Sequence, residues 1–497
     1  MANREQIAVI GAGAMGRGIA QIAVAAGYSV RLWDSNRAAV DEAIAFVARM
    51  LRRAAEKGRM DEGAAQAAIK RLAAADGLPA LAGVDIVIEA IIENLEIKQK
   101  LFTDLEAVVG DGCILATNTS SLSVTAIAAA CRKPERIAGC HFFNPVPLMK
   151  VVEIIAAART APATVERLAA VTDAWGHRPV RVSDSPGFLV NHAGRGLSTE
   201  GLRIVAEGIA EPRQVDDVMR EAAGFRMGPF ELFDLTGLDV SYRVMESIYD
   251  QFYQEPRFRL TPMARQRFDA GLFGRKTGEG FYRYEDGKKI APPADPVPDA
   301  AGFPVWLGAA PDGLAALIGG LEATIDDGTS PADNSLIVLG GVGQDATSQA
   351  VAAGLEAGRV VAVDPLFGLK TRRSLMTTPV TGPEYRDAAH ALLASDGAAV
   401  TVIGDSPGFI AQRVVATIVN IASEIAQSRI ASPADIDAAV RLGLGYPQGP
   451  LAMGDAIGPA VIVEILENMQ AFYGDPRYRP SPWLRRRAAL GVSLTRE

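Results

Sequence analysis

Short apolar runs alternate with helix-like stretches along the first 185 residues. Runs rich in Val, Ile and Leu predict buried strands, and apolar positions that recur every three or four residues predict amphipathic helices. The stretch 6–34, QIAVIGAGAMGRGIAQIAVAAGYSVRLWD, is typical of a strand, a tight glycine turn, a helix and a second strand. The same patterns predict helices at 36–57, at 62–72 and up to about 109, and strands at 85–91, 113–118, 136–143 and 150–156.

This alternation predicts an α/β fold, a doubly wound Rossmann sheet with a helical insertion after the second strand. On such sheets, ligands bind beyond the carboxyl ends of the strands. The polar residues Asp34, Glu93, Asn118, Ser120 and His141 all lie at or just after predicted strand ends. We therefore expect them to share one site.

The second half of the chain contains a long internal repeat. DSPGFLVN at 184–191 recurs as DSPGFIAQ at 405–412, and GFRMGPFELFD at 224–234 recurs as GYPQGPLAMGD at 445–455, both at an offset of 221 residues. FYQEPRFR at 252–259 recurs as FYGDPRYR, at an offset of 220. Self-similarity of this extent indicates a domain duplication. Pro and Gly punctuate both copies as they punctuate helix ends, so each copy is predicted to be all-α.

The pattern divides the chain into five predicted segments. These are a nucleotide-binding Rossmann domain (1–185), a first helical domain (186–285), a Pro-rich linker (286–302), a small degenerate α/β segment (303–404) and a second helical copy (405–497). In the small segment, SLIVLGGVGQDA and the strand ending at Asp364 resemble one half of a degenerate Rossmann domain. No His with a downstream Glu follows before residue 400, and Gln412 stands where the first copy has Asn191. We expect no second active site there, while nucleotide binding without chemistry stays open.

Composition narrows the class of protein. A net charge of −8 argues against a nucleic-acid partner held by phosphate neutralisation. No apolar run approaches the roughly 20 residues of a membrane-spanning helix, and the first predicted strand leaves no room for a signal peptide. The three cysteines lack ligand-like spacing, so we expect neither a disulfide framework nor a metal site. These features suggest a cytoplasmic protein.

The glycine turn is a candidate dinucleotide site. In G-x-G-x-x-G, Gly11 permits the turn, Gly13 lets the backbone approach a pyrophosphate, and Gly16 lets the helix lie close to the strand. The phosphates would lie at the N-terminus of the helix, which Ala14 and Met15 open. Asp34 ends the next strand, where a carboxylate binds the ribose diol, so NAD is favoured over NADP. Arg31 and Arg37 lie close by and leave that preference open.

His141 is the candidate base. It ends a predicted strand, where it can accept an alcohol proton while hydride leaves the same carbon. Glu153 lies on the next strand, KVVEIIA, where an unpaired carboxylate would be costly. A carboxylate bonded to one ring nitrogen would orient the imidazole and stabilise its charged form. A purely structural His–Glu hydrogen bond explains the same pattern equally well.

Five motifs resemble the NAD-dependent L-3-hydroxyacyl-CoA dehydrogenase family. They are GAGAMGRGIA, NTSSLSV (118–124), HFFNPVPLMKVVE, SPGFLVN (185–191) and GRKTGEGFY (274–282), and they cover residues 1–285 in family order. The two-copy length resembles the long bacterial form that acts on 3-hydroxyadipyl-CoA in phenylacetate catabolism. The resemblance implies NAD as cofactor and an acyl-CoA thioester as substrate.

The resemblance also implies roles for single residues. His141 is the base, Glu153 its orienting partner, and Ser120 and Asn191 hydrogen-bond the substrate. Contacts to the nicotinamide side of the cofactor are implied for Glu93, Lys98, Ser120, Asn144 and Lys276. Lys57 matches the position of a cation for the CoA phosphates, although Met50 stands where the family has a serine.

Each of these residues also has an ordinary explanation. Lys98 and Lys57 fit solvated helix charges, Ser120 fits a cap for a helix beginning near 123, and Asn144 before Pro145 fits a turn. Arg195, Arg203, Arg226 and Arg243 are available for a carboxylated acyl tail, but 3-hydroxybutyryl-CoA suits the sequence as well.

Two other functions and two assemblies stay open. The chain could be a non-catalytic NAD-binding relative of the same fold, or another Rossmann enzyme acting on a free hydroxy acid. Family members with one helical domain pair through it. The second copy is therefore expected to pack on the first, giving a monomer with an internal pseudo-dimer, with a homodimer as the alternative.

Overall fold

The computed structural model describes residues 4–290, 292–293, 295–308 and 310–497. Residues 291 and 294 of the predicted linker and residue 309 of the predicted α/β segment lie outside this description. The chain forms two compact units. Unit 1 comprises residues 1–192 and 428–444, and unit 2 comprises residues 193–427 and 445–497.

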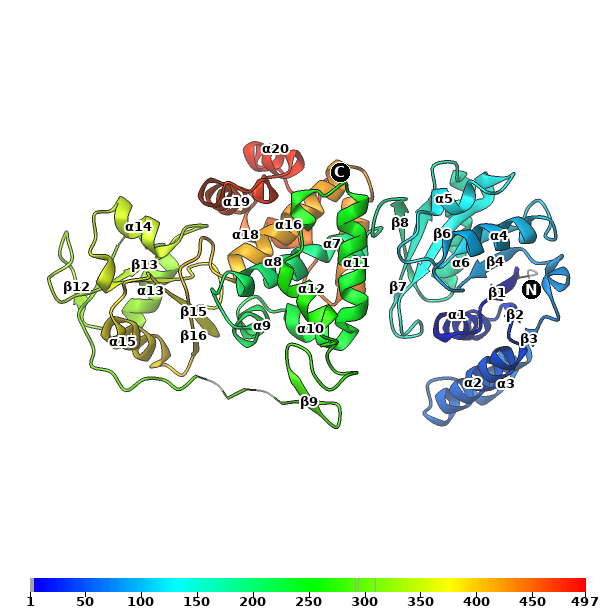
Figure 1. Ribbon diagram of the computed structural model, residues 1–497, viewed down its shortest axis with the longest axis horizontal. Coiled ribbons are helices and arrows are strands. Elements are labelled where there is room, and N and C mark those ends of the chain that lie inside the picture. The colour runs from blue at the N-terminus through cyan, green and yellow to red at the C-terminus, as the bar shows by residue number, and fades with distance from the viewer. Residues whose placement is uncertain (1–3, 291, 294, 309) are drawn as a thin grey trace. The chain divides into compact units, whose positions relative to one another are not determined.

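Unit 1 contains an eight-stranded sheet in the order β3-β2-β1-β4-β5-β6-β7-β8 (Figure 1). All neighbouring strands are parallel except β6 and β7, which are antiparallel. The strands are β1 (Gln6–Ile10), β2 (Ser29–Trp33), β3 (Leu72–Ala74), β4 (Ile86–Glu89), β5 (Ile114–Thr117), β6 (Ile137–Phe142), β7 (Val151–Ala156) and β8 (Arg178–Ser183). The predicted Rossmann sheet is confirmed. The pattern had not indicated β3 and β8.

Helices pack on this sheet and bury its aliphatic side chains in a core that includes Ile7, Val9 and Ile88. The helices of unit 1 are α1 (Ala14–Ala25), α2 (Arg37–Glu56), α3 (Glu62–Lys70), α4 (Leu95–Glu106), α5 (Val124–Ala128), α6 (Pro162–Ala174), α7 (Val190–Ala193, its last residue in unit 2) and α17 (Pro433–Leu444). The predicted insertion is the antiparallel pair of α2 and α3 (Figure 1). Asn36 and Asp61 cap these two helices with their side chains.

Unit 2 holds most of both helical copies. The first copy supplies α8 (Arg195–Ala206), α9 (Pro212–Glu221), α10 (Pro229–Thr236), α11 (Leu238–Gln251) and α12 (Pro262–Asp269). The second supplies α16 (Ala411–Gln427), α18 (Pro450–Ile457), α19 (Pro459–Tyr473) and α20 (Pro482–Leu490). A short hairpin, β9 (Arg283–Glu285) and β10 (Lys288–Ile290), follows the first copy. Within the described residues, no helix combines the length and apolar character that a membrane crossing requires.

A second sheet lies between the two copies in the chain and has the order β12-β11-β13-β14-β15-β16. Its elements are β11 (Val305–Leu307), α13 (Asp312–Gly320), β12 (Ile325–Asp326), β13 (Leu336–Leu339), α14 (Ala346–Ala352), β14 (Val360–Val363), β15 (Arg372–Thr377), α15 (Pro383–Ala394) and β16 (Ala399–Ile403). Here β14 and β15 are the antiparallel pair and β15 and β16 are parallel, as β6, β7 and β8 are in unit 1. The sheet therefore matches the second half of the Rossmann domain.

Two details support this match. Arg136 before β6 and Arg359 before β14 both donate from Nη1 to backbone carbonyls preceding the neighbouring strand, those of Gly110 and Ser335 among them. Ser123 and Asp345 occupy matching N-cap positions of α5 and α14. The duplication thus reaches upstream of DSPGF, and β2 and β3 have no counterpart in the described part of the second sheet.

A segment of each helical copy is hydrogen-bonded to the end of the sheet that precedes the other copy in the chain. In unit 1, Ser183 N at the end of β8 donates to the carbonyl of Ile430 over 2.8 Å. In unit 2, Gly404 N after β16 donates to the carbonyl of Ile209, also over 2.8 Å. The two bonds are counterparts at the 221-residue offset. Such reciprocal contacts are typical of a two-fold symmetric pair of domains.

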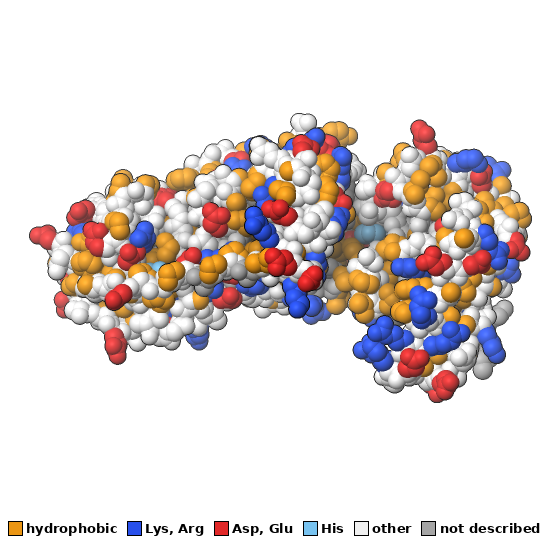
Figure 2. Space-filling view, turned by 60° about the horizontal axis from the view of Figure 1, so that its bottom comes forward, with side chains coloured by type: hydrophobic (Ala, Val, Ile, Leu, Met, Phe, Trp, Pro, Cys, Tyr) orange, Lys and Arg blue, Asp and Glu red, His pale blue; other side chains and the backbone are white. Residues whose placement is uncertain are grey.

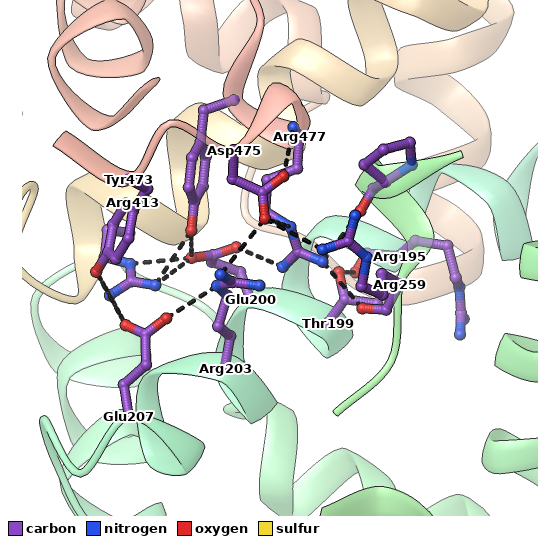
Figure 3. Close-up of polar contacts among 12 residues, drawn as sticks. Arg195, Thr199, Glu200, Arg203, Glu207, Arg259, Arg413, Tyr473, Asp475 and Arg477 are labelled. Carbon is purple, nitrogen blue, oxygen red and sulfur yellow. Dashed lines mark hydrogen bonds and ion pairs between the residues drawn. The ribbon is translucent and has the colours of Figure 1, made fainter. Parts of the chain in front are cut away.

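A buried polar network joins the two copies inside unit 2 (Figure 3). Arg413 of α16 donates to Glu200 of α8 at 2.6 and 2.9 Å and to Glu207 at 2.9 Å. Tyr478 also donates to Glu200, and Tyr473 donates to Glu207. Arg413 and Glu200 are almost fully buried, so both charges depend on compensation by partners inside the network.

We predict that Glu200→Gln destabilises unit 2 by about 2–4 kcal/mol, because the buried Arg413 then loses its buried carboxylate partner and keeps only the partly exposed Glu207. The measurement is the urea-unfolding midpoint of the full chain. Asp269→Asn is the control, because Asp269 forms an exposed pair with Arg265 and its loss should cost less than about 1 kcal/mol. Equal effects of the two substitutions would contradict the prediction.

Candidate active site

The glycine turn follows β1 directly and opens α1. Gly11 has φ +101°, and a Cβ there would lie 2.5 Å from the carbonyl oxygen of Ala90. A Cβ on Gly16 would lie 1.8 Å from the oxygen of Gly11, so packing requires both glycines. At Gly13 a Cβ would meet no atom within 4 Å. The chain itself does not need a glycine there, which fits a position kept open for a ligand.

The N-terminus of α1 is suited to an anion. No side chain caps it at Gly13, and its first turn, which begins with Ala14 and Met15, has no acidic residue. The N–H groups and the helix dipole at such an end attract phosphate. The residues present therefore fit a dinucleotide.

Asp34 follows β2 and is fixed against the same turn. Its Oδ2 accepts a hydrogen bond from Ala12 N at 2.8 Å, and its Oδ1 accepts one from Asn36 N at 2.9 Å. Arg37 forms ion pairs with Asp41 and Asp76, and Arg31 donates to the carbonyl of Ala80. The two arginines that kept NADP possible as the cofactor on sequence grounds are thus bonded to other groups.

A buried ion pair supports the loops after β4 and β5. Lys98 Nζ lies 2.6 Å from Oε1 of Glu89, and both side chains are inaccessible to solvent. The other Glu89 oxygen accepts from Thr117 at 2.7 Å. Lys98 is therefore no solvated helix charge. The sequence signal for Glu89 was an acid at the end of an apolar strand, but it was not singled out.

Glu93 organises the loop that contains Ser120. Its Oε1 accepts from Thr119 Oγ1 at 2.6 Å and from the backbone N–H groups of Ser120 and Ser121, and its Oε2 lies 3.4 Å from Lys98. Burial raises the pKa of Glu93, but these hydrogen bonds and the charge of Lys98 outweigh it and hold the pKa below its usual value. Ser123, not Ser120, caps the following helix, so the capping explanation for Ser120 is wrong.

His141 and Glu153 are paired partners on β6 and β7. His141 Nδ1 lies 2.5 Å from Oε2 of Glu153, and both side chains are buried. The rings of Phe143 and Phe188 flank the imidazole, with centroids at 4.5 and 5.8 Å. With Nδ1 bonded to Glu153, Nε2 is the nitrogen left for a substrate proton.

The turn after β8 holds the other oxygen of Glu153. Oε1 accepts hydrogen bonds from the backbone N–H groups of Leu189 at 3.0 Å and Val190 at 2.7 Å. Gly187 and Phe188 both have positive φ, +72° and +50°, which is unusual for phenylalanine. Asn191 follows the turn directly in α7, so the same backbone that holds Glu153 also fixes the start of the Asn191 side chain.

A cavity of about 430 Å³ lies beside the start of α1 and the α2–α3 insertion. Phe46, Met50, Val146 and Leu148 are among its apolar lining residues, and Asn144 also lines it. Its charged lining residues are all cations, namely Arg17, Arg53, Lys57 and Arg59. Figure 2 shows Lys and Arg side chains gathered over this part of unit 1. Of the four, only Lys57 was singled out from the sequence, because no role is implied for Arg17 within GAGAMGRGIA, and Arg53 and Arg59 lie outside the five motifs.

Three of the predicted residues form ion pairs within unit 2. Lys276 belongs to unit 2, where it forms an ion pair with Asp239. Arg203 pairs with Glu207 and Asp475, and Arg243 pairs with Glu246. These pairs occupy two of the four arginines considered for a carboxylated acyl tail.

The matching position in the second sheet lacks this chemistry. The register that pairs His141 with Glu153 pairs Asp364 with Ser374, because Val363 and Leu375 are partners and Asp364 N donates to the carbonyl of Ser374. Gln412 donates to Asp364 at 2.9 Å and accepts from Gly343 N at 2.8 Å. The second copy thus keeps the framework of the site with an acid in place of the imidazole.

A Rossmann sheet with this turn, this acid at β2 and a His–Glu pair at the carboxyl edge defines an NAD-dependent dehydrogenase. The family model described as the 3-hydroxyacyl-CoA dehydrogenase NAD binding domain matches residues 6–185 of this chain. The model of the C-terminal domain of the same family matches twice, at 187–284 and 408–494. The chain belongs to the 3-hydroxyacyl-CoA dehydrogenase family.

Three relatives show the extent of the similarity. The 3-hydroxyadipyl-CoA dehydrogenase of Escherichia coli is 38% identical over 490 residues, covering 99% of this chain and 98% of that protein. A probable 3-hydroxybutyryl-CoA dehydrogenase of Bacillus subtilis is 39% identical but covers 57% of this chain. The crystal structure of a 3-hydroxybutyryl-CoA dehydrogenase from E. coli matches with a TM-score of 0.85, 36% identity, and coverage of 98% of this chain and 99% of that chain.

We predict a pH-dependent cost at Asp364. Burial raises its pKa to about 6, against the hydrogen bonds from Gln412 and Leu366 N that lower it. An unfolded Asp ionises near pH 3.9, so between about pH 4 and pH 6 the native chain keeps a proton that the unfolded chain has released. Stability from this group therefore falls as pH rises through that window.

The measurement is urea unfolding of wild type and Asp364→Asn at about pH 5 and about pH 8. From the lower to the higher pH, the free energy of unfolding of the variant should rise relative to that of the wild type by on the order of 1 kcal/mol. A difference that does not change with pH would show that Asp364 is charged in the native state throughout.

Proposed function

We propose that this chain oxidises the C3 hydroxyl of an L-3-hydroxyacyl-CoA to the 3-ketoacyl thioester, with His141 as the base and Glu153 as its orienting partner. The observation that supports this most is the buried 2.5 Å contact between His141 Nδ1 and Glu153 at the carboxyl edge of the NAD-binding sheet. The names of the relatives support the substrate class.

In this proposal, His141 Nε2 removes the hydroxyl proton as the C3–H bond breaks. When bound, NAD⁺ accepts the hydride from C3. Glu153 holds the ring by Nδ1 and stabilises the imidazolium that forms, while Leu189 N and Val190 N hold Glu153. Ser120 and Asn191 donate hydrogen bonds to the C3 oxygen, whose negative charge grows during the transfer.

The remaining roles belong to the same proposal. Gly11, Gly13, Gly16, Ala14 and Met15 bind the pyrophosphate, and Asp34 binds the adenosine ribose. On the nicotinamide side, Glu93, Ser120 and Asn144 contact the cofactor. Lys98 forms an ion pair with Glu93. The proposed contacts of Lys98 and Lys276 to the cofactor rest on the family resemblance alone.

Lys57 and the cationic cavity bind the CoA nucleotide in this proposal. Four cations without a lining acid favour a phosphorylated ligand, and the guanidinium of Arg17 stacks on Phe46 at 4.1 Å, which leaves a flat surface suited to a purine. The acyl group is 3-hydroxybutyryl or 3-hydroxyadipyl, the two that the relatives' names print.

Two further parts of the proposal concern the whole protein. The reciprocal contacts and the Arg413 network support a monomer with an internal pseudo-dimer. The absence of nucleic-acid partners and the cytoplasmic location rest on charge and cysteine usage.

The test of the function is oxidation of NADH at 340 nm with acetoacetyl-CoA and with 3-oxoadipyl-CoA. We predict turnover with at least one thioester. For His141→Gln we predict a drop in kcat of about 10²–10⁴-fold, since a positioned base contributes that much. NADH binding, followed by fluorescence, should survive. Near-wild-type kcat in this variant would refute the base.

Glu153→Gln is the companion variant. It should lower kcat with little change in the Kd for NADH, because its carboxylate acts through His141. A large loss of NADH binding would instead indicate the purely structural His–Glu bond. No turnover by the wild type with any 3-ketoacyl thioester would favour the non-catalytic relative.

We predict that Lys57→Ala raises KM for acetoacetyl-CoA by about 2–5-fold, the size of an exposed charge pair, and that salt reduces the effect. The control substrate is acetoacetyl-pantetheine, which lacks the nucleotide phosphates and should show no change. An equal rise with both thioesters would remove Lys57 from the phosphate site.

A further inference from the structure

The second copy contributes a helix to the unit that contains the candidate active site. Residues 428–444, with helix α17, belong to unit 1, although the rest of the second copy lies in unit 2. Asp435 of α17 accepts from Arg178 Nη2 at 3.0 Å and from Arg181 N at 3.1 Å, and both donors lie on β8. Asp435 is buried while the Arg178 side chain is half exposed, so this anchor lies at the boundary of the core.

The inner face of α17 is made of Ile436, Ala439, Val440 and Gly443, which follow one another at helical spacing. The first three are fully buried. At Gly443 the helix lies against residues next to the candidate site. A Cβ there would lie 3.0 and 3.1 Å from the two methyl groups of Val190 and 3.5 Å from a methyl group of Val151.

Val190 is also the residue whose backbone N–H holds Glu153 most closely, at 2.7 Å. Val151 begins the strand on which Glu153 lies, two residues away. The Gly443 contact therefore joins the two pieces of backbone that fix the carboxylate. Gly443 has no positive φ that would require glycine, so the reason for glycine is space.

We propose that Gly443, from the second helical copy, is a positioning residue for the His141–Glu153 pair. It lets α17 lie against Val190 and so sets the position of the N–H groups that hold Glu153. This inference rests on the proposed function of that pair. It assigns the duplicated domain a part in catalysis besides the internal pairing of the two copies.

The test compares Gly443→Ala and Gly443→Val in the full chain. Alanine suits a helix better than glycine, so the melting temperature should hold or rise for Gly443→Ala, while its kcat falls because Val190 must move by a few tenths of an ångström. For Gly443→Val we expect a kcat loss of about 10²-fold, as for misplaced catalytic groups generally. The Kd for NADH should not change, because the glycine turn is untouched.

Two variants separate positioning from general damage. Val190→Ala removes the contacted methyl groups, so adding it to Gly443→Ala should restore kcat. Ala222→Val makes a matched change at the counterpart of Gly443 in the first copy, where the neighbour is Gly368 in the loop between β14 and β15, and should leave kcat unchanged.

A spectroscopic readout reports on the pair itself. The short Nδ1 hydrogen bond of His141 deshields its proton, so a far-downfield NMR resonance absent from His141→Gln should shift or broaden in Gly443→Ala and return in the double variant. Wild-type kcat and an unmoved resonance in Gly443→Ala and Gly443→Val would overturn the inference. The proposed function fails separately, if His141→Gln itself keeps its activity.

Discussion

The carboxylate of Glu153 is the point on which the rest of the site depends. One oxygen binds the imidazole of His141 and the other accepts two backbone N–H groups from the turn at 187–190. A buried carboxylate is costly unless hydrogen bonds satisfy it, and this one uses both oxygens. The left-handed conformation of Phe188, which follows Gly187 in the same turn, is the local cost of bringing those N–H groups to it. Strand pairing, turn and helix packing on unit 1 therefore converge on a single ionisable group.

Sequence patterns predicted the fold of the first domain well, because parallel strands buried on both faces are near-continuous apolar runs. They missed β3, which has only three residues, and β8, whose RPVRVS alternates polar and apolar positions. Spacing also brought His141 and Glu153 to neighbouring strands, which the structure shows as direct partners. The burial of Lys98 was harder to predict, because nothing in the sequence of a helix marks a lysine as buried unless its partner, here Glu89, is known.

The small α/β segment shows a different limit. A strand, a glycine-rich turn and a second strand ending in an acid occur in both halves of a Rossmann domain, and sequence alone does not say which half is present. Strand order does: the antiparallel pair of β14 and β15 identifies the second half. The cavity cations Arg53 and Arg59 were likewise invisible as a set, because only the folded α2–α3 pair places them with Arg17.

The exchange of α17 has a consequence for how the protein is made. Unit 1 is discontinuous in the chain: its first part ends at residue 192 and its last part begins at 428. At ordinary translation rates of 5–20 residues per second, the missing helix leaves the ribosome roughly 10–50 s after the sheet it covers. During that interval the edge strand β8 lacks the segment that covers it, and such edges invite association with other chains. The nascent Rossmann domain therefore exposes this edge for longer than a domain encoded in one piece would.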